Sequence, residues 1–115
     1  MTIQKDNGII EITNDVFTVI SGYVATNCFG VKGMAQRNMK DGIVGLLKKE
    51  HMARGVKISF DKDRVVIEIH IVVEHGVNIP AVCQSIMSEV RYNVERYTQV
   101  KVKAVNVCVD SMMAG

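Results

Sequence analysis

Glu68, His70 and Glu74 are the most closely spaced side chains able to do chemistry, and they alternate with valine and isoleucine. Side chains two positions apart in an extended chain point to the same face, so these three share one surface. Imidazole and carboxylate groups are common metal ligands, and Glu68 with His70 is compatible with a metal site. A site also needs a third converging ligand, which the sequence does not provide. We therefore favour a solvated or partner-facing sheet surface and expect no metal and no cofactor.

The three cysteines form no recognised motif, and a free reactive thiol is the one chemistry that they leave open. Cys28, Cys83 and Cys108 are far apart and form no CxxC pair, which excludes the usual zinc and redox motifs. Each stands among apolar neighbours, which predicts small core residues in a reducing compartment. The sequence also lacks a Ser-His-Asp order, a P-loop and a nucleophile elbow. We expect no catalytic residues, no small-molecule substrate and a protein that is not an enzyme.

A glycine loop gives an alternative function. Gly30, Val31, Lys32 and Gly33 form a GxxG motif between two predicted helices, the arrangement with which KH domains clamp single-stranded nucleic acid. Residues 32–57 hold seven basic and two acidic residues, a difference of +5. Gly30, Lys32, Gly33 and Arg37 are thus the candidate nucleic-acid residues. Two glycines at this spacing are common, however, and the whole chain carries a net charge of only +2, so nucleic acid stays the second hypothesis.

The predicted elements that position these residues centre on a strand over 64–75. Its alternate residues are all β-branched and apolar, as expected for one buried face: Val65, Ile67, Ile69, Ile71 and Val73. A second strand over 56–60 precedes it, and Asp61-Lys62-Asp63 predicts the turn of a β-hairpin.

Helices and further strands flank this hairpin. Helical spacing of apolar residues predicts helices over 14–28 and 41–51, and a third from the cap Asn78 to Tyr97. Residues 8–12 and 100–109 read as the first and last strands. The valines of 100–109 change parity midway, which predicts a β-bulge or a bend near Ala104.

The order β-α-(α)-β-β-α-β predicts an α+β two-layer sandwich, with a mainly antiparallel sheet and the helices on one face. A chain of 115 residues fits a single domain over 1–115, with a core at about 8–109. The first seven and last five residues look loose. The N-terminus lacks the apolar run of a signal peptide, and no stretch has the roughly 20 apolar residues of a membrane span, so we expect a cytoplasmic protein.

Several of these segments, in this order, resemble the alkaline shock protein family of envelope stress response proteins, including its YloU-like members. The matching stretches are GIIEI at 8–12, FGVKGM at 29–34, GVKI at 55–58, the strand 64–74, residues 79–95 and VNVCV at 105–109. The resemblance implies cytoplasmic proteins, mostly of Gram-positive bacteria, linked to envelope or alkaline stress. It also implies self-association and, for some members, a small protein that anchors them at the inner face of the membrane. It implies no catalytic residue and no cofactor.

The combined prediction is a non-enzymatic scaffold that binds proteins, itself above all. An unpaired strand edge invites strand addition, so the first and last strands are the candidate interaction edges. Their candidate residues are Ile10, Glu11, Lys103 and Asn106.

Overall fold

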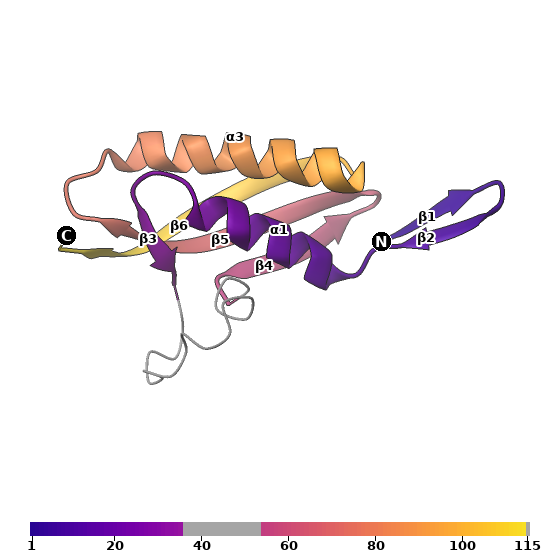
Figure 1. The fold of residues 1–115 in the computed structure, drawn as a ribbon, viewed down its shortest axis with the longest axis horizontal. Coiled ribbons are helices and arrows are strands. Elements are labelled where there is room, and N and C mark those ends of the chain that lie inside the picture. Colours follow the sequence, from indigo (N-terminus) through magenta and orange to yellow (C-terminus); the bar gives the residue numbers. More distant parts are fainter. Residues whose placement is uncertain (36–53, 115) are drawn as a thin grey trace.

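The computed structural model describes residues 1–35 and 54–114, and its main sheet is built around β5 (Arg64–Glu74). One edge of β5 pairs antiparallel with β4 (Val56–Asp61) and, further along, with β3 (Val31–Met34). The other edge pairs along almost its whole length with β6 (Val102–Met113). The strand predicted over 64–75 is therefore the centre of the sheet (Figure 1).

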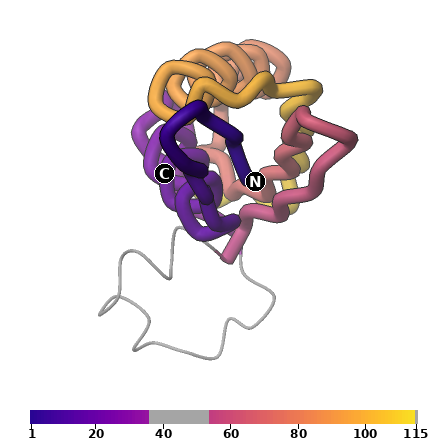
Figure 2. Tube along the Cα trace, turned by 90° about the vertical axis from the view of Figure 1, so that its right-hand side faces the viewer, coloured from indigo at the N-terminus to yellow at the C-terminus, as the bar shows by residue number. Residues whose placement is uncertain are grey.

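Two helices cover one face of this sheet (Figures 1 and 2). α1 (Asn14–Thr26) packs against β3 and β4, and α3 (Ile79–Thr98) packs against α1 and β6. The Asn78 side chain caps α3 by accepting a hydrogen bond from the Ala81 N–H at 3.0 Å, as its sequence position predicts. The buried face of β5 and the apolar stripe of α3 form the centre of the core: Val65, Ile67, Ile69, Ile71, Val73, Val82, Ile86, Val90 and Val94. The helix predicted over 41–51 lies outside the described residues.

β6 pairs parallel to β5, whereas the other described strand pairs are antiparallel. α3 carries the chain back over the sheet between these two strands, and such a crossover makes them parallel. The predicted α+β class, with a mainly antiparallel sheet and helices on one face, is confirmed. Of the β-bulge or bend predicted near Ala104, the structure has the bulge, because Lys103 is an extra residue between the pairs of Val65 and Val66. A second bulge falls at Asp110.

The N-terminus differs from the prediction. β1 (Thr2–Lys5) and β2 (Gly8–Glu11) form a separate two-stranded hairpin, which projects from the body as an arm (Figure 1). Residues 8–12 therefore do not belong to the main sheet, and the first seven residues are not loose. At the other end, β6 continues through Met113, four residues beyond the predicted strand. Backbone pairing with β5 orders this end although its side chains are exposed.

Candidate protein-interaction surfaces

The first residue on the outer edge of β6, Val102, already has hydrogen-bond partners for its outward backbone groups. The Val65 N–H donates to the Lys101 carbonyl at 2.9 Å, so the backbone groups of Val65 face β6 and those of its partner Val102 face outward. Both Val102 groups are bound by α3. Arg91 Nη1 donates to the Val102 carbonyl at 2.6 Å, and the Val102 N–H donates to Glu95 Oε2 at 2.9 Å. Side chains of α3 thus cover the start of this edge.

The edge is open beyond that point. Val105, Val107 and Val109 pair with Ile67, Ile69 and Ile71 of β5. These isoleucines follow Val65 at every second position, so their backbone groups also face β6. The N–H and C=O groups of the three valines therefore point away from β5, and no strand of residues 1–35 or 54–114 pairs with them. The segment between Lys103 and Asp110 contains no charged side chain to discourage pairing.

The two candidate residues on β6 lie beside these valines. Lys103 occupies the first bulge and forms an ion pair with Asp61 of β4. Asn106 is exposed opposite Glu68, and the alternation turns its backbone groups toward β5. Sequence reasoning therefore found the edge strand but not its free donors, because only the pairing partner decides which residues of a strand face outward.

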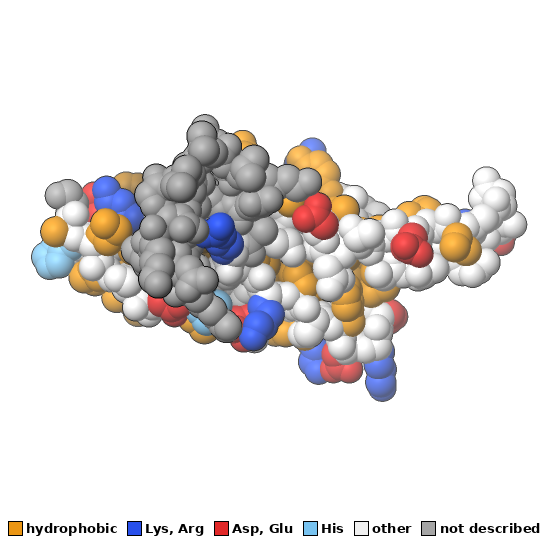
Figure 3. All heavy atoms as spheres, turned by 90° about the horizontal axis from the view of Figure 1, so that it is seen from below, with side chains coloured by type: hydrophobic (Ala, Val, Ile, Leu, Met, Phe, Trp, Pro, Cys, Tyr) orange, Lys and Arg blue, Asp and Glu red, His pale blue; other side chains and the backbone are white. Residues whose placement is uncertain are grey.

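The projecting arm is a second open edge. Met1 and Ile12 exchange both backbone hydrogen bonds, at 2.7 and 2.8 Å. Hydrogen-bonded pairs recur at every second position of an antiparallel ladder, so Ile3 and Ile10 form the next such pair and turn their backbone groups toward each other. The outward N–H and C=O groups of β2 belong to Ile9 and Glu11. The side chains of Ile9 and Ile10 are nevertheless 61% and 46% exposed. Figure 3 shows the arm standing clear of the body, with hydrophobic and acidic side chains on its surface.

A groove runs beside the β6 edge, between it and the outer flank of α3. Its volume is about 440 Å³, and apolar and charged side chains share its walls. The lining residues are Gln84, Met87, Ser88, Arg91, Tyr92, Glu95 and Val105.

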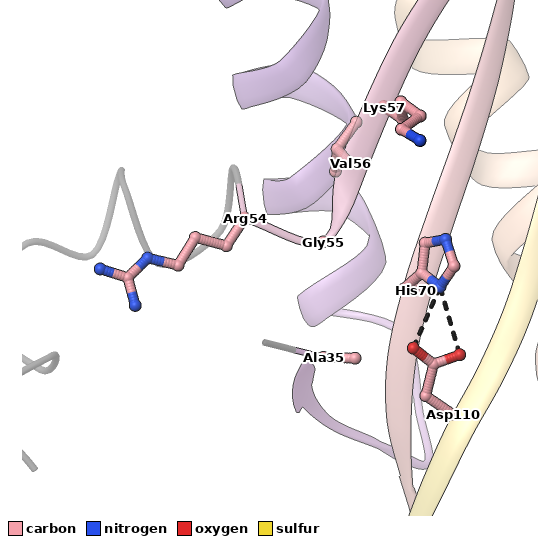
Figure 4. A pocket seen from close by; sticks show the side chains of 7 residues that line it. All are labelled: Ala35, Arg54, Gly55, Val56, Lys57, His70 and Asp110. Atoms are coloured by element: carbon pink, nitrogen blue, oxygen red, sulfur yellow. Dashed lines mark hydrogen bonds and ion pairs between the residues drawn. The ribbon is translucent and has the colours of Figure 1, made fainter. Parts of the chain in front are cut away.

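The polar face of the sheet holds a three-residue cluster centred on His70. His70 Nε2 lies 2.7 Å from Glu68 Oε2, and Nδ1 lies 3.0 Å from Asp110 Oδ2. Figure 4 shows Asp110 of β6 facing the imidazole ring from the neighbouring strand. The hydrogen bond with Glu68, followed by the weaker effect of Asp110, raises the pKa of His70 above its ordinary value. The two carboxylates thus favour the imidazolium, which can donate to both.

This cluster borders a pocket of about 400 Å³ that Ala35, Arg54, Gly55, Val56 and Lys57 also line (Figure 4). Sequence reasoning placed Glu68 and His70 on one face and found no third partner. The structure supplies Asp110 through the second bulge of β6. The two carboxylates bond opposite nitrogens of the ring, and no group of described His, Cys, Asp and Glu residues could hold a metal ion.

The GVKG motif is a turn at Gly30 followed by β3, and not a loop as we predicted. The second helix that we expected to follow it lies outside the described residues. Gly30 has a φ of +89°, and a Cβ atom there would lie 2.9 Å from Cγ2 of Val82. Val31 and Gly33 pair with β5, and Lys32 is an exposed extra residue between them. Arg37 and most of the basic segment 32–57 lie outside the described residues.

The three cysteines are half-buried free thiols rather than core residues. Burial is the main cause that raises the pKa of each thiol: Cys28, Cys83 and Cys108. A raised pKa disfavours the reactive thiolate. Over the described ranges, no helix is both long and apolar enough to cross a membrane.

Comparison with known proteins agrees with the resemblance seen in the sequence. YloU of Bacillus subtilis, an uncharacterised protein, is 33% identical over 111 residues, which cover 96% of this chain and 92% of YloU. The uncharacterised Spy1614 of Streptococcus pyogenes shows the same identity and coverage. A Streptococcus pyogenes protein named stress response regulator gls24 homolog is 35% identical over 80 residues, which cover 70% of this chain and 43% of that protein. No solved structure matches the chain.

The model of the ASP23 family, to which the alkaline shock proteins belong, matches residues 2–114, which is nearly the whole chain. This family is described by a cell envelope-related function. Because this family model covers nearly the whole chain and two relatives are 33% identical over 96% of it, the chain belongs to the ASP23 family, the alkaline shock protein family.

Proposed function

We propose that this protein is a non-enzymatic scaffold that self-associates by strand addition in a cell envelope-related role. The observation that carries the proposal is the outer edge of β6, where Val105, Val107 and Val109 present backbone groups that no strand of the described residues pairs with. Hydrogen bonding to such an edge is a common mode of protein recognition. The half-exposed Met112 and Met113 add apolar surface for binding at the end of the strand.

The arrangement of polar residues supports binding rather than catalysis. In the His70 cluster both ring nitrogens already face carboxylates, so neither is free to activate a nucleophile. The thiols have raised pKa values, which weakens them as nucleophiles.

A single substitution at Val107 tests the edge. Val107→Pro removes the central outward N–H, and proline is tolerated where that group faces solvent. Val107→Thr keeps both the N–H and the β-branched shape and is the matched control. In sedimentation velocity, we expect wild-type and Val107→Thr proteins to form species larger than the 12.7 kDa monomer as concentration rises, and Val107→Pro to remain monomeric. A monomeric wild-type protein over the micromolar range would remove the self-association proposal.

The envelope role implies a second partner. We propose that a small membrane-anchoring protein holds the scaffold at the inner face of the cell membrane, which the envelope-related function of the family supports. In-cell crosslinking, followed by separate analysis of membrane and soluble fractions, tests this. We expect capture of an integral membrane protein, and recovery from the soluble fraction alone contradicts the anchor.

A further inference from the structure

The arm has exposed apolar side chains and an open edge but no covering element among the described residues. A two-stranded hairpin alone is marginally stable in water, and Ile9 gains little burial from the described body of its own chain, being 61% exposed. The arm projects along the long axis of the molecule, where a second molecule can reach it (Figure 1).

The β6 edge can pair only with a strand that has no helix packed above it. α3 packs over β6. If two copies paired through β6 around a twofold axis, each would carry its α3 above the joined strands. The helix axes would then be separated by about one strand spacing, 4.8 Å, whereas packed helices need about 8–10 Å. A hairpin without a helix above it avoids this clash.

We propose that the arm of one copy is the strand that adds to β6 of the next copy, with β2 antiparallel to β6. The inference rests on the proposed self-association and names the segment responsible for it. In this register Ile9 lies opposite Val107, and Glu11 lies opposite Val105. All four residues have outward backbone groups, so both pairs are hydrogen-bonded pairs.

The side chains match in this register. Residues opposite each other in a sheet point to the same face, so Ile9 and Glu11 point to the helix side, toward the groove beside α3. Ile9 meets the end of the groove that Met87 lines, so an apolar side chain of the arm faces an apolar side chain of α3. Glu11 meets the end where Arg91 and Glu95 bind the two backbone groups of Val102, which places its carboxylate beside a polar part of the groove.

The contact uses two different surfaces, so it is head-to-tail. Such contacts close into rings or continue as open chains, rather than stopping at a twofold dimer. An open assembly would keep one free β6 edge at one end and one free arm at the other, so further copies can add at both ends.

Disulfide trapping tests the register directly. Ile10 and Asn106 form the intervening non-hydrogen-bonded pair, whose Cα atoms lie about 4.5 Å apart. This distance is inside the range of about 4.4–6.8 Å that a disulfide requires. Two proteins are prepared, one with Ile10→Cys and one with Asn106→Cys, each with its three native cysteines replaced by serine and with tags of different size.

We expect a reducible heterodimer when the two proteins are mixed under mild oxidation, and none when either is oxidised alone. Assembly without this heterodimer would overturn the arm register while leaving self-association in place. A mixture that stays monomeric in sedimentation, with wild-type protein also monomeric, would overturn both proposals.

A charge on the arm gives an independent readout without engineered cysteines. Ile9→Lys places an ammonium group in the apolar part of the groove, and we expect the wild-type assembly to be lost. Phe29→Lys is the matched control, because Phe29 is an exposed apolar residue outside both proposed surfaces, at 86% exposure. Equal assembly of the two variants would overturn the role of the arm.

Discussion

The Nδ1 atom of His70 lies 3.0 Å from a carboxylate oxygen of Asp110, although the two residues are 40 positions apart in the chain. Asp110 is the extra residue of the second β6 bulge, which aims its side chain at β5. β-bulges redirect single side chains in this way. Together with Glu68, the contact joins His70 to two carboxylates on the polar face of the sheet.

This contact predicts a pH dependence of stability. The pKa of His70 is raised in the folded protein above its ordinary 6.5, so its stabilising effect is complete below pH 6.5 and is lost as pH rises through the raised value. His70, Glu68 and Asp110 are partly exposed, so we expect the cluster to change the free energy of unfolding by no more than about 1 kcal/mol. In an NMR titration, Glu68→Gln should lower the His70 pKa most and Asp110→Asn should lower it less. An unchanged titration midpoint in both variants would contradict this account.

Position 55 requires glycine, because it lies where β5 stops pairing with β4 and begins to pair with β3. The His70 N–H donates to the Gly55 carbonyl at 2.7 Å, and a Cβ atom on Gly55 would lie 2.6 Å from the His70 carbonyl oxygen. Gly55→Ala should therefore destabilise the fold by about 1–3 kcal/mol, as overpacking does. Gly33→Ala is the control, because a Cβ atom there has no described neighbour within 4 Å. Urea denaturation that gives both variants equal stability would show that the strand junction can relax.

Two buried hydroxyl groups predict effects of opposite sign. Ser21 Oγ is buried without a hydrogen-bond partner in the described structure, whereas Thr98 Oγ1 donates to the Val94 carbonyl at 2.6 Å and accepts from the Val100 N–H at 3.1 Å. Ser21→Ala removes an unsatisfied polar group and should raise the free energy of unfolding by about 1 kcal/mol. Thr98→Val should lower it by about 1–3 kcal/mol, because it leaves the Val100 N–H without an acceptor. Thermal unfolding distinguishes the two, and a loss of stability in Ser21→Ala would point to a bound water at that hydroxyl.

Local patterns were sufficient to predict much of the main sheet. The alternation of Val65 to Val73 predicted β5, and Asn78 with the apolar stripe behind it predicted α3. The parity change among the valines of β6 predicted a bulge or a bend, because a straight strand cannot bury residues of both parities. These features are visible in sequence since each depends on neighbours within a few residues.

Long-range pairing explains what was missed. β3 is four residues long and includes Gly33, so it has no alternation of its own and exists as a strand through β5. The partner Asp110 was missed because a bulge in the polar end of a strand disturbs no hydrophobic pattern. Which donors of β6 face outward, those of Val105, Val107 and Val109, depends likewise on a partner strand far away in the chain.

Two residues of the GVKG motif can be tested for different roles, Gly30 for packing and Lys32 for binding. At Gly30 the positive φ and the closeness of Val82 both oppose a side chain, so Gly30→Ala should lower the free energy of unfolding by about 1–3 kcal/mol. Lys32→Glu changes an exposed side chain and should stay within about 0.5 kcal/mol of wild type. Chemical denaturation of both variants gives the comparison, and binding of single-stranded RNA at low salt is measured on the same samples. Salt-sensitive RNA binding that Lys32→Glu abolishes would add a nucleic-acid role to this strand, whereas unchanged stability in Gly30→Ala would contradict its packing role.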